Sequence, residues 1–137
     1  MNELQRTLNW FQLAVPNPTY KNKSVQVGCF YEEVNEVSDA LGYTMWDLKE
    51  AANAYKSHDD EILLTDSERI ELLDGLCDTI VTAVGVAHMF GMDIMGAMSE
   101  VNRSNFSKFV EGKPVFNEQG KIAKPTTFSA PNLEGFV

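Results

Sequence analysis

Residues 29–41 carry apolar and acidic side chains at a spacing that a helix gathers onto one side. At about 100° per residue, one face of this helix holds four apolar residues: Phe30, Val34, Val37 and Leu41. Glu33 and Glu36 follow the edge of that face, and no lysine or arginine lies within a helical turn of them. A carboxylate at a core edge is costly unless it is paired, protonated or bound to a metal. We therefore expect this helix to pack through its apolar face. We expect its acidic pair to be paired, protonated or bound to a metal.

A later segment, from Thr65 or Asp66 to Phe90, repeats this pattern. Its apolar arc consists of Ile70, Leu73, Cys77, Ile80, Val81 and Val84. Glu71, Asp74 and Asp78 line one border of that arc at helical spacing. If the two helices pack with their acidic borders facing each other, their carboxylates form one cluster.

Three further segments have helical periodicity and recognisable ends. Asn2 can cap a helix that Pro16 stops, and Asp93 can cap one that reaches Phe109. Thr44 and Asp47 resemble a capping box for another helix. The expected helices cover about residues 3–13, 24–41, 45–58, 66–90 and 94–109. We predict an all-α fold, a four- to five-helix bundle.

The last part of the chain, residues 110–137, lacks helical periodicity and is rich in glycine and proline. Val115, Phe116 and Ile122 can form short strand pieces around a turn at Asn117 to Gly120. We expect this irregular tail to wrap the helical body. The whole chain, 1–137, is expected to form a single domain.

The charge and cysteine content limit the partners and the compartment. The 137 residues have a net charge of -9, which repels nucleic acid and anionic membranes. A phosphate-bearing substrate would need cations to bridge it to the protein. Two cysteines and no apolar run of about 18 residues predict a soluble, cytoplasmic protein with reduced thiols.

A cluster of Glu33, Glu36, Asp74 and Asp78, with Glu71 nearby, offers only oxygen ligands. Oxygen ligands suit Mg²⁺, or Mn²⁺ in its place. Zinc and di-iron sites fit less well, because the chain has only His58 and His88 and no Glu-x-x-His pair. Mg²⁺ beside carboxylates promotes attack of water at phosphorus, and no P-loop sequence is present.

The run Glu32-Glu33-Val34-Asn35-Glu36, with Asp39-Ala40 after it, resembles the EExxE signature of the MazG-like all-α nucleoside triphosphate pyrophosphohydrolases. The helix with Asp78 resembles their second acidic motif. Residues 100–108, followed by Gly112-Lys113-Pro114, Gly120-Lys121 and Lys124-Pro125, are similar to the C-terminal region of a branch common in bacteriophages and bacteria. In a bacteriophage protein, the expected compartment is the host cytoplasm.

The resemblance implies hydrolysis of a nucleoside triphosphate, expected to be a dNTP, to the monophosphate and pyrophosphate. Glu33 and Glu36 match the metal ligands of the first motif, and Asp78 matches the last aspartate of the second. The family has a glutamate three residues before that aspartate, where this chain has Gly75. We predict Asp74 as the substitute ligand and Glu71 as an outer-shell or third-metal ligand.

Other site residues follow from the same resemblance. Glu32, expected to point further toward solvent, is the weakest of the three candidate catalytic glutamates and would either bind no metal or activate water. Asn102, Asn105 and Lys108 are candidates for contact with the sugar or phosphates. Asn102 is equally well interpreted as a core amide bonded to a neighbouring helix. Four lysines are either surface residues or phosphate ligands, with Lys108 ranked first: Lys108, Lys113, Lys121 and Lys124.

The family assembles as dimers or pairs of dimers, so a homodimer or homotetramer is expected, with the pocket near a subunit interface. Two alternatives stay open. One is a pyrophosphohydrolase of another nucleotide, such as phosphoribosyl-ATP. The other is a non-catalytic helical assembly module, in which the acidic columns form salt bridges to a partner.

Overall fold

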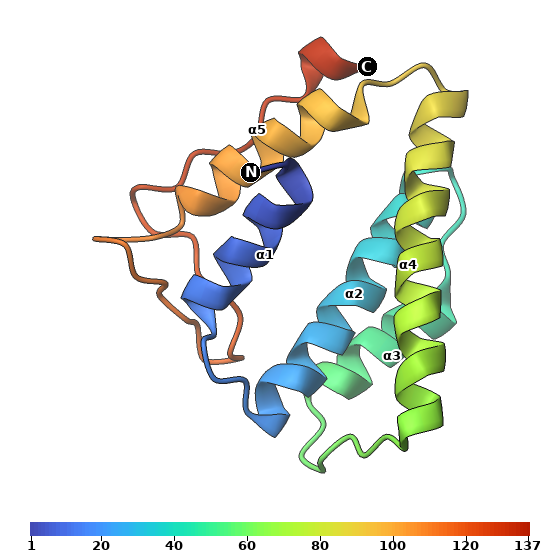
Figure 1. Ribbon diagram of the computed structural model, residues 1–137, viewed down its shortest axis with the longest axis vertical. Helices are drawn as coiled ribbons and strands as arrows, with labels where there is room; N and C mark the ends of the chain where they lie inside the picture. The colour runs from blue at the N-terminus through green and yellow to red at the C-terminus, as the bar shows by residue number, and fades with distance from the viewer. The chain divides into compact units, whose positions relative to one another are not determined.

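The computed structural model describes all 137 residues and is all-α with an irregular C-terminal tail, as predicted (Figure 1). The α-helices are α1 (Glu3–Ala14), α2 (Tyr20–Ala40), α3 (Trp46–Lys56), α4 (Asp66–Met89) and α5 (Ile94–Phe106), and a 3₁₀ turn, η1 (Glu134–Phe136), follows. The chain divides into two compact units. Unit 1 contains residues 1–16, 64–115 and 123–137, and unit 2 contains residues 17–63 and 116–122. We describe each unit by itself.

Most helix ends match their sequence signals. Asn2 and Thr65 form capping boxes with Gln5 and Glu68, and the Asp93 side chain accepts from the Gly96 amide. The start of α2 was expected near residue 24 but lies at Tyr20, since Thr19 and Asn22 form a capping box there. The capping box expected at Thr44 is absent: Thr44 instead donates to Asp39 Oδ1 at 2.8 Å.

In unit 2, α2 and α3 pack side by side (Figure 1). The buried residues of α2 are small or polar: Ser24, Val25, Gly28 and Asn35. The Ser24 hydroxyl donates to the carbonyl of Tyr55, and the Tyr31 and Tyr55 rings stack with centroids 5.7 Å apart. A Cβ at Gly28 would lie 2.6 Å from Lys56 Cγ and 2.7 Å from the Ala52 carbonyl oxygen. The two helices therefore approach closely because Gly28 has no side chain.

The apolar face expected to hold α2 in the core is not the one that meets α3. Val37 and Leu41 are exposed, and Phe30 and Val34 are only half-buried. This prediction was wrong because close helix packing selects small side chains at the point of contact. Val37 and Leu41, at the C-terminal end of this face, stay on the surface.

Residues 116–122 form a tight hairpin that belongs to unit 2. Phe116 and Ile122 pair in an antiparallel bridge, and the Gly120 amide donates to the Asn117 carbonyl. The Asn117 side chain also accepts from the amides of Gln119 and Lys121. The predicted turn is confirmed, and it presents Lys121 to α2.

In unit 1, α1 packs on α5. Trp10 Nε1 donates to the Asn105 carbonyl at 2.9 Å, and the Trp10 ring stacks on Phe109. Helix α5 ends at Phe106, three residues earlier than expected. The Asp93 amide donates to the carbonyl of Phe136, which holds the end of the tail at the start of α5.

Helix α4 contacts α5 but leaves most of its apolar arc exposed in unit 1. The large apolar side chains exposed on it include Ile70, Leu73, Ile80, Val81 and Val84. No single helix is long and apolar enough to cross a membrane. The helices α4 and α5 meet that criterion only as a pair, and they are bent by 118°.

The close approach at Gly28 gives a stability prediction. Gly28→Ala should lower the free energy of unfolding by about 1–3 kcal/mol, because its Cβ overlaps the α3 backbone. In the control Gly75→Ala, the added Cβ on α4 has no neighbour within 4 Å. That substitution should stabilise by about 0.5–1 kcal/mol through helix propensity. Urea denaturation measures both, and an unchanged stability of Gly28→Ala would contradict the packing described.

Candidate functional site

The acidic motif occupies the middle of α2 in unit 2. Glu33 and Glu36 are exposed and one helical turn apart, whereas Glu32 is half-buried. This reverses the expected order, in which Glu32 pointed furthest toward solvent. Asn35, within the same motif, is buried and donates to Asp39 Oδ2 at 3.3 Å.

Two lysines explain why Glu32 turns inward. Lys56, the last residue of α3, forms an ion pair with Glu32 Oε2, and Lys121 of the hairpin donates to the same oxygen at 2.8 Å. Sequence reasoning missed Lys56 and did not rank Lys121 first. The only available signal was the position of Lys121 beside a predicted turn, because both partners of Glu32 are distant in sequence.

The two ammonium groups change the electrostatics of this part of α2. Hydrogen bonds from Lys121 and then Lys56 hold the pKa of Glu32 below its ordinary value, although partial burial opposes this. The bond to Glu32 raises the pKa of Lys121 in return. Burial raises the pKa of the neighbouring Cys29 thiol against the influence of both lysines. Glu32 is therefore ionised and Lys121 is charged at neutral pH.

The second acidic column lies on α4, in unit 1. Glu71, Asp74 and Asp78 are all exposed, and Asp74 and Asp78 lie one turn apart on the helix. Neither unit by itself gathers three or more histidine, cysteine or carboxylate side chains into a group that could hold a metal ion. That the α2 and α4 carboxylates form one cluster stays a prediction. It is also a prediction that Asp74 or Glu71 replaces the family glutamate.

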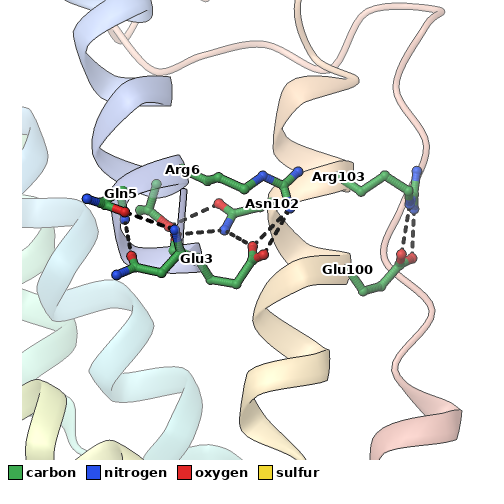
Figure 2. Close-up of polar contacts among 8 residues, drawn as sticks. Glu3, Gln5, Arg6, Glu100, Asn102 and Arg103 are labelled. Carbon is green, nitrogen blue, oxygen red and sulfur yellow. Dashed lines mark hydrogen bonds and ion pairs between the residues drawn. The ribbon is translucent and has the colours of Figure 1, made fainter.

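Asn102 on α5 is 1% exposed, and its side chain forms hydrogen bonds with residues of α1 (Figure 2). Its Nδ2 donates to the Glu3 carbonyl at 3.1 Å and to Glu3 Oε2 at 2.9 Å, and its Oδ1 accepts from Thr7. The Asn102 bond is the main cause of the lowered pKa of Glu3. This is the contact expected of a core amide, and the substrate contact of Asn102 stays a prediction.

Asn105 and Lys108, the other two predicted substrate residues, lie together in unit 1. Lys108 Nζ donates to Asn105 Oδ1 at 2.9 Å. The Lys108 and Lys124 ammonium groups lie 5.8 Å and 5.2 Å from the centroid of the Phe128 ring, a distance that suits cation–π attraction. Both Asn105 and Lys108 are half-buried.

The donor set on α2 fits a hard divalent cation. Glu33 and Glu36 supply carboxylate oxygens from one exposed helix edge, and no thiolate or imidazole lies in their motif. Comparisons with protein-family models, with curated proteins and with solved structures each found no match to this chain. The functional assignment therefore depends on the residues themselves.

The pairing of Glu32 predicts a pH-dependent contribution to stability. Because the pKa of Glu32 is lowered on folding, its contribution is complete above the unfolded value of about 4.3 and is lost as the pH falls through the lower folded value. Glu32→Gln should therefore cost about 1 kcal/mol at pH 7 and less at pH 3. Denaturation of both proteins at the two pH values tests this, and an equal difference at both would contradict it.

Proposed function

We propose that this protein is a Mg²⁺-dependent nucleoside triphosphate pyrophosphohydrolase, which converts a nucleoside triphosphate, expected to be a dNTP, to the monophosphate and pyrophosphate. The observation that carries the proposal is the pair of exposed carboxylates, Glu33 and Glu36, one turn apart on α2. They stand in a motif that resembles EExxE of the MazG-like enzymes. Two lysines adjoin the same motif through Glu32, so both metal-binding and anion-binding groups are present there.

In this proposal Glu33 and Glu36 hold Mg²⁺ from α2. Asp74 and Asp78 would supply further ligands from α4, and Glu71 would be an outer-shell or third-metal ligand. Bound Mg²⁺ would neutralise phosphate charge and activate water. The net charge of -9 makes such neutralisation necessary, because an acidic surface would otherwise repel a triphosphate.

Water attacks the α-phosphorus, and the bond from that phosphorus to the oxygen bridging the α and β phosphates breaks. Pyrophosphate leaves with the bridging oxygen, and a carboxylate takes the proton of the attacking water. A base that is held ionised by two ammonium groups accepts a proton less readily. The pKa of Glu32 is lowered in this way. We propose that the proton goes to one of the metal-site carboxylates or to Glu32, with Glu32 the less suitable candidate.

Asn105 and Lys108 are the substrate residues that the resemblance selects and that unit 1 places together. An amide beside an ammonium group suits a sugar hydroxyl or a phosphate oxygen. We propose this contact for the nucleotide. Because nucleoside triphosphates are cytoplasmic metabolites, we also place the enzyme in the cytoplasm.

We further propose a homodimer or homotetramer. The exposed apolar arc of α4 supports this, since an exposed apolar patch of such size is typical of an interaction surface. Sedimentation velocity at micromolar concentration should give a mass of two or four times 15.3 kDa. A single species of monomer mass would contradict it.

Pyrophosphate release is measured in the presence of Mg²⁺ with a panel of dNTPs, NTPs and phosphoribosyl-ATP. We expect at least one dNTP to be cleaved, and Glu36→Gln and Asp78→Asn each to lower kcat/KM by roughly 100-fold or more. Even an outer-shell partner of a metal is worth roughly 10- to 100-fold. The exposed Glu50 of α3 provides the matched control, and Glu50→Gln should retain full activity.

The same panel separates the alternatives. Cleavage of phosphoribosyl-ATP alone would replace the proposed substrate with another nucleotide. An absence of pyrophosphate release from every compound, together with an absence of Mg²⁺ or Mn²⁺ binding by calorimetry, would favour the non-catalytic assembly module.

A further inference from the structure

The Glu32 carboxylate is bound by more positive charge than it can neutralise. Both Lys56 and Lys121 bind its Oε2 atom, so one negative and two positive charges meet there. The two positive charges stand out in a chain with a net charge of -9. A pairing that served only to hold Glu32 would need one lysine.

The two ammonium groups also carry more donors than the bonds to Glu32 require. Each lysine has three N–H groups, and both Lys56 and Lys121 donate to Glu32. Their side chains are 20% and 41% exposed, so an anion can reach them from solvent. The remaining N–H groups can bind the oxygens of a phosphate without breaking the bonds to Glu32.

The position of the lysine pair relates it to the acidic motif. Glu33 follows Glu32 directly on α2, and it acts electrostatically on Lys121. Glu36 lies about one turn further along the same helix. A polyphosphate bridged by Mg²⁺ to Glu33 and Glu36 would therefore have its remaining oxygens near the lysines.

We propose that Lys56 and Lys121 form a phosphate-binding subsite for the polyphosphate chain of the substrate. This inference rests on the proposed function for the identity of the substrate, while its anion-binding part can be measured without turnover. The subsite is built from α3 and the 116–122 hairpin, and Glu32 positions both cations. Charge-assisted bonds from lysine to phosphate supply the affinity.

The test is calorimetric titration with inorganic pyrophosphate in saturating Mg²⁺. Lys121→Met and Lys56→Met should each weaken pyrophosphate binding by about tenfold, the value of one charge-assisted hydrogen bond at a partly exposed site. Their affinity for Mg²⁺ alone should be unchanged within a factor of about two or three. Lys121→Arg keeps the charge and should restore most of the affinity.

Lys23→Met is the matched control, since Lys23 is exposed on α2 and lies nine residues before Glu32, on the opposite side of the helix. It removes the same charge and should bind pyrophosphate like the wild-type protein. Circular dichroism and thermal unfolding check that the variants are folded. Wild-type affinity in Lys121→Met, or no pyrophosphate binding by the wild-type protein, would overturn the proposal.

The Glu32→Gln variant distinguishes an anion-binding site from lysines that serve only as structural ion pairs. This variant keeps both ammonium groups and loses only the carboxylate that positions them, so pyrophosphate binding should weaken less than in Lys121→Met. If the lysines only hold Glu32 in place, Glu32→Gln would weaken binding as much as Lys121→Met does, and the subsite would be excluded. Loss of pyrophosphate affinity in Lys121→Met without nucleotide hydrolysis by the wild-type protein would support the subsite and refute the proposed enzyme.

Discussion

The close approach of α3 to α2 at Gly28 determines the arrangement of charge in unit 2. Because this position has no Cβ, the aliphatic part of Lys56 lies directly against the α2 backbone, and its ammonium group reaches Glu32 one turn along the helix. Lys121 binds the same oxygen from a hairpin far along the chain. Gly28 thus helps to place Lys56, and the hairpin places Lys121, beside the acidic motif.

This arrangement suits the proposed chemistry. A triphosphate brings several negative charges to a protein that is itself strongly acidic, so binding needs a cation near every phosphate. Mg²⁺ on Glu33 and Glu36 would supply part of that charge, and Lys56 and Lys121 would supply another part. The pairing with Glu32 keeps the lysines in position before the substrate arrives, which reduces the entropy lost on binding.

Local sequence signals predicted the helices well, because caps such as Asn2, Thr65 and Asp93 act within one turn. Hydrophobic periodicity selected the wrong contact face of α2, since it does not detect helices that meet through small residues. The ion pairs of Glu32 join residues far apart in the chain, and such contacts leave no local pattern. The burial of Asn102 against Glu3 and Thr7 has the same origin. The metal and substrate residues remain predictions, since their roles depend on ligands.

We propose that carboxylates of α2 and α4 bind the same metal ion, and a double-mutant cycle on Mg²⁺ affinity tests this proposal most directly. Calorimetry would compare the wild-type protein, Glu36→Gln, Asp78→Asn and the double variant. If both residues serve one site, each single variant loses most of the affinity and the double variant loses little more. Additive losses, or Mg²⁺ binding that either substitution leaves unchanged, would contradict the account.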